Sequence, residues 1–137
     1  SAAGGTGNGT IAQAKEYRSQ GKDVWAIGVD SDQYEDGVYA DGKSAVLTSM
    51  IKRVENATKY ALDQVKAGTF KAETVVLDSK ADGVGFSDKN AELGADIVAK
   101  VNDVKAKIIS GEVKVIPTYA EAKAAKVVPD NLQASDK

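Results

Sequence analysis

The residues that could carry chemistry in this chain are carboxylates, lysines, tyrosines and hydroxyl groups, because it contains neither cysteine nor histidine. Cysteine provides thiolate nucleophiles and disulfides, and histidine is the usual general base near neutral pH and the commonest metal ligand. Thiol chemistry and Cys or His metal sites are therefore excluded within these 137 residues. We expect a protein that is not an enzyme and that uses no cofactor.

The first candidate site is the glycine-rich segment at residues 4–9, GGTGNG. Successive glycines let backbone N–H groups approach an anion or a sugar closely, and a helix that follows adds its positive end. No Lys-Ser/Thr pair follows the last glycine, so the segment is not a P-loop, and its spacing does not fit G-x-G-x-x-G. A binding loop and a plain turn both remain open interpretations.

The second candidate is the segment at residues 28–33, GVDSDQ, which follows a short apolar run. A carboxylate just past a buried strand, here Asp30, lies at the carboxyl end of that strand and can accept hydrogen bonds from two neighbouring hydroxyl groups. An Asx turn or a helix cap is the simpler interpretation. A cation site formed by Asp30, Asp32 and Asp36 is a weak alternative, because the spacing lacks the glycine and the closing glutamate of an EF-hand.

Two further segments combine unusual residues. Lys52 is predicted to begin a helix, where its charge opposes the helix macrodipole, and a residue placed against a local preference often has a function. The alternative is a lysine that simply points into water. The segment at residues 83–86, GVGF, has two glycines around apolar residues and indicates a backbone crossing between packed units, although Phe86 could be ordinary core. Trp25 is expected to serve packing.

The elements that must position these groups alternate between strands and helices. The apolar patterning predicts strands at residues 24–29, 45–48, 74–77 and 113–116, and helices at about 11–20, 51–65 and 93–108. Gly21, Gly68 and Gly111 follow the three helices as stop signals. The alternation predicts an α/β fold with a largely parallel sheet. Residues 81–90 are expected to form a loop, and the tail from Pro117 is expected to be partly ordered at most.

Several of these segments, taken in order, resemble one known family. The segments AAGGTGNG, VWAIGVDSDQ, VLTSMIKRVENA, VLDSKADGVGFSDKN and IISGEVKV, from Ala2 to about Ile116, are similar to the carboxy-terminal half of the basic membrane protein (Bmp, PnrA-like) family of ABC-transporter substrate-binding lipoproteins. The resemblance implies a type I periplasmic-binding-protein fold, in which two three-layer α/β sandwich lobes hold a ligand between them. Residues 1–116 are then expected to contribute to both lobes, and residues 117–137 to form a carboxy-terminal tail.

The same resemblance implies a function and a set of site residues. Members bind purine nucleosides and deliver them to the membrane permease of an ABC transporter from outside the cytoplasmic membrane, held by a lipid anchor that is not in this chain. By this resemblance Asp30 grips the ribose hydroxyls, Lys52 approaches the same sugar, and the backbone at Gly4 and Gly5 lines the sugar side of the cleft. The residues that sandwich the base mostly belong to the amino-terminal half, which is not in this chain.

The resemblance also implies an arrangement and a partner for the chain. If it is one half of a two-lobed protein, its apolar helix faces should be covered by the missing amino-terminal half, or the fragment should self-associate. Residues from Ser49 to about Phe70 are then expected to lie in the opposite lobe from Trp25 to Asp30, with crossing points near Val46 and Gly83.

Two other functions remain open beside nucleoside capture. One is a ligand-sensing domain of a receptor or regulator with the same fold, and the other is a small α/β enzyme that uses Asp30 and Lys52 as an acid–base pair. Nucleic-acid binding is excluded because the formal net charge is −2 and no basic block occurs. No apolar run approaches the roughly 20 residues needed to cross a bilayer.

Overall fold

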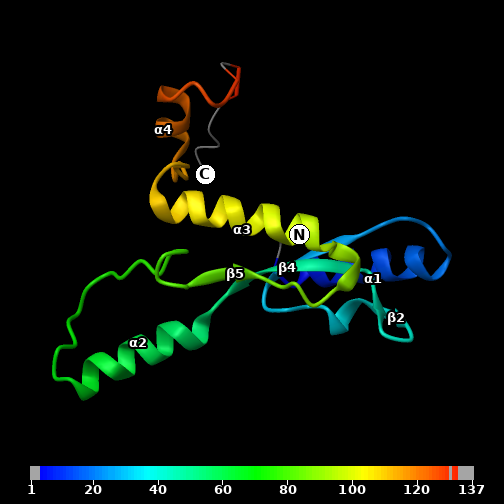
Figure 1. Cartoon of the computed structure of the whole chain (residues 1–137), viewed down its shortest axis with the longest axis horizontal. Coiled ribbons are helices and arrows are strands. Elements are labelled where there is room, and N and C mark those ends of the chain that lie inside the picture. The colour runs from blue at the N-terminus through cyan, green and yellow to red at the C-terminus, as the bar shows by residue number, and fades with distance from the viewer. Residues whose placement is uncertain (1–3, 130, 133–137) are drawn as a thin grey trace.

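The computed structural model describes residues 4–129, 131 and 132 (Figure 1). Its regular elements follow one another as helices, short 3-10 turns and short strands. In chain order they are α1 (Thr6–Ser19), β1 (Ala26–Asp30), η1 (Glu35–Gly37), β2 (Val38–Ala40), β3 (Lys43–Ser44), β4 (Val46–Lys52), α2 (Val54–Lys66), β5 (Val84–Phe86), η2 (Ala91–Leu93), α3 (Ala95–Ser110) and α4 (Tyr119–Ala124).

The main sheet has three strands in the order β1-β4-β5. β1 and β4 run parallel, with Asp30 opposite Ile51 near their carboxyl ends. β5 pairs antiparallel with the other side of β4, with Met50 opposite Phe86. β2 and β3 form a separate two-stranded hairpin. The expected α/β class is therefore confirmed, but the sheet in the described part of the chain is mixed rather than largely parallel.

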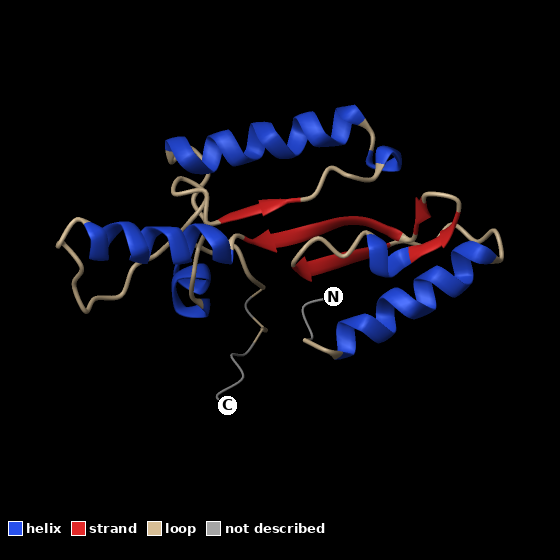
Figure 2. Ribbon diagram, turned by 90° about the horizontal axis from the view of Figure 1, so that it is seen from below, coloured by secondary structure: helices blue, strands red, loops and turns tan. Residues whose placement is uncertain are grey.

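The buried core lies where α1 packs against the start of the sheet. Ile11 and Ala14 on α1 are buried against Ala26, Ala45 and Val46. Three of these five residues are alanines, and short side chains let a helix backbone approach a sheet closely. Figure 2 shows α1 running alongside the strands, with its beginning beside the tip of β1. This packing fixes the position of α1 relative to the carboxyl end of β1.

The longer helices α2 and α3 are placed differently. α2 continues outward from the end of β4, and α3 lies over β5 (Figure 1). The structure describes every residue of these two helices, and none of them is buried. Their large apolar side chains are instead exposed, among them Val54, Tyr60, Leu62, Val65, Ile97, Val101, Val104 and Ile109. The predicted amphipathic helices are confirmed, and their apolar faces are largely uncovered in this chain.

The structure corrects the predicted start of two helices. α1 begins at Thr6, inside the segment expected to be a loop, because Gly4 and Gly5 provide the first turn and residues 6–9 enter the helix. β4 extends to Lys52, so Lys52 ends a strand and does not begin a helix. The prediction failed there because pairing with β1 on one side and β5 on the other prolongs the strand.

Other differences concern the second half of the chain. Residues 74–77 and 113–116 were expected to be strands and form none, because no described strand runs beside them. Residues 84–86, expected within a loop, form β5 by pairing with β4. The tail contains α4, whose first turn is capped by Thr118, which accepts a hydrogen bond from the Glu121 N–H at 3.2 Å. The last residues of the tail, 130 and 133–137, lie outside the described residues.

Candidate functional site

The carboxyl ends of the two parallel strands bring together the two charged candidates. Asp30 is the last residue of β1 and Lys52 the last residue of β4. Lys52 Nζ lies 2.7 Å from Asp30 Oδ1, with side chains 59% and 57% exposed. An exposed pair of this kind contributes little to stability, about 0–1 kcal/mol. Both groups therefore remain accessible to a third polar molecule at the edge of an α/β sheet, where such sheets commonly bind ligands.

Asp30 adopts a backbone conformation that is uncommon for a residue with a side chain. Its φ is +76°, in the left-handed region. That region costs about 1–2 kcal/mol for most residues, although aspartate and asparagine tolerate it better than others. Such a conformation persists when the surrounding structure determines it. The carboxylate is thus held at the end of β1 by its surroundings and not by its own preference.

Gly4 and Gly5 lie at the amino-terminal end of α1. Gly4 has φ +53°, and Gly5 is the N-cap residue. Their carbonyls accept hydrogen bonds from the N–H groups of Gly7 and Asn8, at 3.0 and 3.2 Å. A glycine cap offers no side chain to the first N–H groups of the helix, so those of Gly7 and Asn8 are satisfied by backbone carbonyls alone. The start of α1 lies at the same end of the sheet as the tip of β1 (Figure 2).

A glutamine that the sequence analysis did not single out links these two pieces. Gln33 Oε1 accepts the Val29 N–H at 3.0 Å, and Gln33 Nε2 donates to Asn8 Oδ1 at 3.2 Å. The Gln33 N–H donates to Ser49 Oγ at 3.1 Å, and Ser49 is fully buried in β4. The only sequence signal for this residue was its place at the end of the GVDSDQ segment.

The close packing around Gln33 depends on a glycine in β1. A Cβ added to Gly28 would lie 2.4 Å from Ser49 Oγ and 3.0 Å from the Gln33 Cβ. The first distance is too short for any side chain, so residue 28 must be glycine for the loop to pack on β4. This gives the glycine of GVDSDQ a structural role.

The loop after β1 also contacts the residues that follow β5. Ser87 Oγ donates to Asp32 Oδ2 at 2.9 Å, and Lys89 Nζ lies 2.5 Å from Glu35 Oε1. The hydrogen bond to Glu35 raises the pKa of Lys89 above its ordinary value. The stabilisation from this pair is fully present below the ordinary lysine pKa and is lost as the pH rises through the raised value. The pair is therefore formed at neutral pH, but because both side chains are exposed it contributes little to stability.

The three aspartates considered as a cation site have separate partners. Asp30 pairs with Lys52, while Asp32 accepts hydrogen bonds from Ser87 and from the Tyr34 N–H. Asp36 accepts a hydrogen bond from the Gln33 side chain. Within the described residues, no group of three His, Cys, Asp or Glu side chains is arranged to hold a metal ion. The suggestion of a cation site is therefore wrong for this part of the chain.

Beside Lys52, the chain leaves the sheet and returns to it. The Arg53 N–H donates to the Gly83 carbonyl at 2.9 Å, so the two passages are hydrogen-bonded to each other. Asp82 lies at this point and pairs with Arg53 Nε at 3.4 Å and Lys105 Nζ at 3.6 Å. The side-chain amide of Asn56 donates to the Asp82 carbonyl at 2.8 Å. A crossing at Gly83, as the sequence indicated, fits this arrangement.

The expected lobe assignment is wrong for four residues. Residues 49–52 belong to β4, where Ser49 lies opposite Gly28 and Ile51 opposite Asp30 in one continuous ladder. They therefore share a sheet with the end of β1, because β4 is longer than the apolar pattern indicated. The chain leaves this sheet after Lys52, not near Val46. The position of α2 in an opposite lobe stays a prediction.

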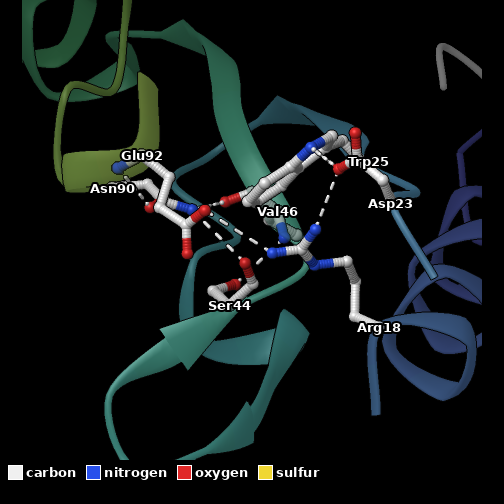
Figure 3. A network of polar contacts seen from close by, with 7 residues as sticks. All are labelled: Arg18, Asp23, Trp25, Ser44, Val46, Asn90 and Glu92. Carbon is white, nitrogen blue, oxygen red and sulfur yellow. Dashed lines mark hydrogen bonds and ion pairs between the residues drawn. The ribbon is translucent and has the colours of Figure 1, made fainter. Parts of the chain in front are cut away.

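A second polar network lies at the other end of β1, away from the candidate site (Figure 3). The Arg18 guanidinium stacks over the Trp25 ring, 3.8 Å from its centroid, and pairs with Asp23 at 3.0 Å and Glu92 at 3.5 Å. The Trp25 indole N–H donates to the same Asp23 carboxylate at 2.9 Å. Trp25 therefore serves packing, as the sequence predicted, and the network ties α1 to β1 and η2.

An apolar recess lies elsewhere, between α3 and β5. It has a volume of about 400 Å³ and is lined by Met50, Ser79, Val84, Gly85, Phe86, Lys100, Val101, Val104, Lys105 and Ile108. It is separate from the Asp30–Lys52 pair and presents almost no polar groups. No helix among the described residues has the length and apolar character to span a membrane.

Comparison with known proteins gives this arrangement a context. The family described as "ABC transporter substrate-binding protein PnrA-like" matches residues 1–118. Two similar proteins are "CD4+ T-cell-stimulating antigen" of Listeria monocytogenes, 42% identical over 123 residues, and "ABC transporter nucleoside-binding protein BmpA" of Lactococcus lactis subsp. cremoris, 37% identical over 123 residues. These alignments cover 83% and 82% of this chain and 34% of each relative, so the chain spans about a third of their length.

A solved structure supports the same fold. A solute-binding protein of an ABC transporter system from Aeropyrum pernix K1 is similar over 87% of this chain and 40% of that chain, with a TM-score of 0.61 and 25% sequence identity. The expected relation of this fold to that of ABC solute-binding proteins is therefore confirmed.

Proposed function

This chain belongs to the PnrA-like family of ABC transporter substrate-binding proteins, and from that premise we propose that the complete protein captures purine nucleosides outside the cytoplasmic membrane for the permease of an ABC importer. The protein is then a binding protein and not an enzyme. A lipid anchor outside this chain would hold it at the membrane. The nucleoside is supported by the relative named as a nucleoside-binding protein in Lactococcus lactis, 37% identical over 123 residues, and by the chemistry of the site.

The observation that carries the proposal is the exposed Asp30–Lys52 pair at the carboxyl ends of two parallel strands. A carboxylate can accept two hydrogen bonds from neighbouring hydroxyl groups, which is the pattern that a ribose diol offers. The ammonium group of Lys52 can donate to an oxygen of the same sugar. The backbone of Gly4 and Gly5, at the start of α1, would line the sugar from the other side.

We assign residues 1–116 to both lobes of this protein and residues 117–137 to a carboxy-terminal tail. The support is the outward course of α2 after Lys52 and the crossing at which Arg53 is hydrogen-bonded to Gly83. The exposed apolar faces of α2 and α3 would then be covered by the preceding half of the same protein. A 137-residue chain that sediments as a stable 14.3 kDa monomer would contradict this assignment.

Calorimetry on the complete protein tests the site. Asp30→Ala should weaken nucleoside binding by about 2–4 kcal/mol, or roughly 30- to 1000-fold, because the two hydrogen bonds to the diol are charge-assisted. Free bases should bind far more weakly than nucleosides, with 2′-deoxynucleosides between them. Asp63→Ala is the matched control, since Asp63 is also an exposed, lysine-paired aspartate but lies on α2.

Three outcomes would overturn the proposal. Equal affinity for adenine and adenosine, or an Asp30→Ala variant that binds as the wild type does, would reduce the carboxylate to a turn residue. Conversion of the nucleoside by the purified protein, followed by chromatography, would instead favour an acid–base role for Asp30 and Lys52.

A further inference from the structure

The loop after β1 contains one side chain that touches both parts of the proposed site. We propose that Gln33 is a positioning residue: it holds Asp30 in its left-handed conformation and fixes the start of α1 relative to it. This inference rests on the proposed nucleoside-binding function. It concerns a residue that does not itself need to contact the ligand.

The first step of the argument is a ring closed around Asp30. The hydrogen bond from the Val29 N–H to Gln33 Oε1, at 3.0 Å, joins the residue before Asp30 to one that follows it by three positions. Asp30, at φ +76°, lies inside this ring. An extended conformation at Asp30 would carry the chain straight on and pull Gln33 away from Val29. The hydrogen bond and the uncommon conformation therefore depend on each other.

The second step is the link to α1. Gln33 Nε2 donates to Asn8 Oδ1, and Asn8 stands in the first turn of α1, close behind Gly4 and Gly5. The backbone N–H of Gln33 is meanwhile fixed to buried Ser49 in β4 at 3.1 Å. One residue thus sets the spacing between the helix start, the end of β1 and the strand that carries Lys52.

The third step is that a carboxamide suits this position chemically. Its oxygen accepts from Val29, and its nitrogen donates both to Asn8 and to Asp36 Oδ2, each at 3.2 Å. A glutamate could accept from Val29 but would place a second carboxylate beside Asp36. A leucine of similar size would make none of the three side-chain hydrogen bonds.

The test compares two ligands in the complete protein. Gln33→Leu should weaken binding of a ribonucleoside by about 10- to 100-fold, as expected when the geometry of one or two charge-assisted hydrogen bonds is lost. Binding of the matching 2′,3′-dideoxynucleoside, which has no diol for Asp30 to hold, should change by less than about twofold. A residue with a merely structural role would lower the affinity for both ligands equally.

A conservative exchange provides the rescue. In the double variant Gln33→Glu/Asp36→Asn, the carboxylate and the amide change places, so position 33 keeps its acceptor and position 36 supplies a donor. The rotated Asn8 amide can also donate to the new carboxylate. Ribonucleoside affinity should return to within about threefold of the wild type, whereas Gln33→Glu alone should stay weak. Gln64→Leu is the matched control, because it makes the same exchange at the far end of α2, where Gln64 Oε1 accepts a hydrogen bond from Thr69 Oγ1 at 2.6 Å.

The outcomes separate this inference from the function on which it rests. A wild-type protein that binds no nucleoside contradicts the proposed function. A wild type that binds, with Gln33→Leu equally tight or equally weakened for both ligands, overturns the role of Gln33. A crystal structure of Gln33→Leu decides the point without any ligand: we expect Asp30 to leave positive φ and separate from Lys52, and an unchanged Asp30 would refute the inference. If Gln33→Leu does not fold, Gln33→Glu and its rescue carry the same comparison.

Discussion

The helices α1 and α3 are similar in length but differ in how far they are buried. Their sequences alone predict the opposite order of burial. α1 has a weak apolar stripe, broken by glycines, yet its Ile11 and Ala14 are buried. α3 has a much clearer stripe, yet none of its residues is buried. α2 follows α3 in this respect. Burial in this chain is therefore decided by which partner surface is present and not by how apolar the helix face is.

The difference separates the molecule into two regions. In the region of α1, β1 and the start of β4, small and apolar side chains meet across a helix–sheet interface and form the core. In the region of α2 and α3, apolar side chains face outward. The first region therefore has its packing partners within the described residues, whereas no described residue buries the apolar faces of α2 and α3, and the proposed covering lobe would do so. Four experiments test this contrast.

The largest effect is expected from truncating the core of the first region. Ile11→Ala should lower the free energy of unfolding by about 2–4 kcal/mol, because Ile11 is 3% exposed and its removal leaves a cavity beside Val46. Urea unfolding of the complete protein and of the 137-residue chain should show a similar loss in both. A loss below about 0.5 kcal/mol in either would show that the core does not stabilise this region.

A smaller and conditional effect is expected on the exposed face of α2. Leu62 is 56% exposed in this chain. Leu62→Ala should therefore change the stability of the 137-residue chain by less than about 0.5 kcal/mol. In the complete protein the same substitution should cost about 2 kcal/mol, since a covering lobe would bury the side chain. If Leu62→Ala lowers the stability of both proteins equally and only slightly, α2 stays uncovered in the complete protein. The difference in burial between the two regions would then not arise from missing partners.

An intermediate effect is expected where α1 is tied to β1 by polar contacts. Arg18→Met should cost about 1 kcal/mol, because the guanidinium stacks on Trp25 at 3.8 Å and pairs with two carboxylates at the margin of the core. Arg18→Lys should recover little of this loss, since an ammonium group lacks the planar fork that stacks and bonds at once. Full recovery with lysine, measured by urea unfolding, would show that charge alone matters.

The smallest effect is expected on the surface of α2. Asp63→Asn removes the pair between Lys59 and Asp63, one helical turn apart. The loss should be about 0.3 kcal/mol, and 1 M salt should abolish the difference between variant and wild type. Amide hydrogen exchange within α2 measures so small a change better than global unfolding does. A loss above about 1 kcal/mol would place this pair in a more buried setting than the structure shows.

Local signals in the sequence predicted the helix ends well. Gly21, Gly68 and Gly111 were predicted to stop three helices, and all three have positive φ just past α1, α2 and α3. These stops depend on conformational freedom that glycine alone has in full, so no knowledge of the rest of the molecule was needed. Asp30 and Lys52 were also picked out singly, because unusual residues at element boundaries are visible in a sequence.

Features that depend on pairing could not be predicted in the same way. β5 at residues 84–86 exists because β4 is beside it, and residues 74–77 form no strand because nothing described pairs with them. For the same reason β4 continues to Lys52. Lys52 is therefore not in the first turn of a helix, and its charge does not oppose a helix macrodipole. The place of Gln33 between Val29 and Asn8 joins residues up to 25 positions apart, and no local pattern contains that information.

The backbone of Asp30 also limits how this protein can evolve. At φ +76° the position favours glycine, asparagine and aspartate, while the proposed recognition of a ribose diol requires a carboxylate. Only aspartate meets both conditions, so the position is constrained twice over. A lineage or laboratory selection that loses binding to the sugar hydroxyls should therefore first acquire asparagine or glycine at residue 30. Glutamate would keep the charge but would not fit the left-handed backbone conformation. Libraries aimed at new ligands should start from those two variants.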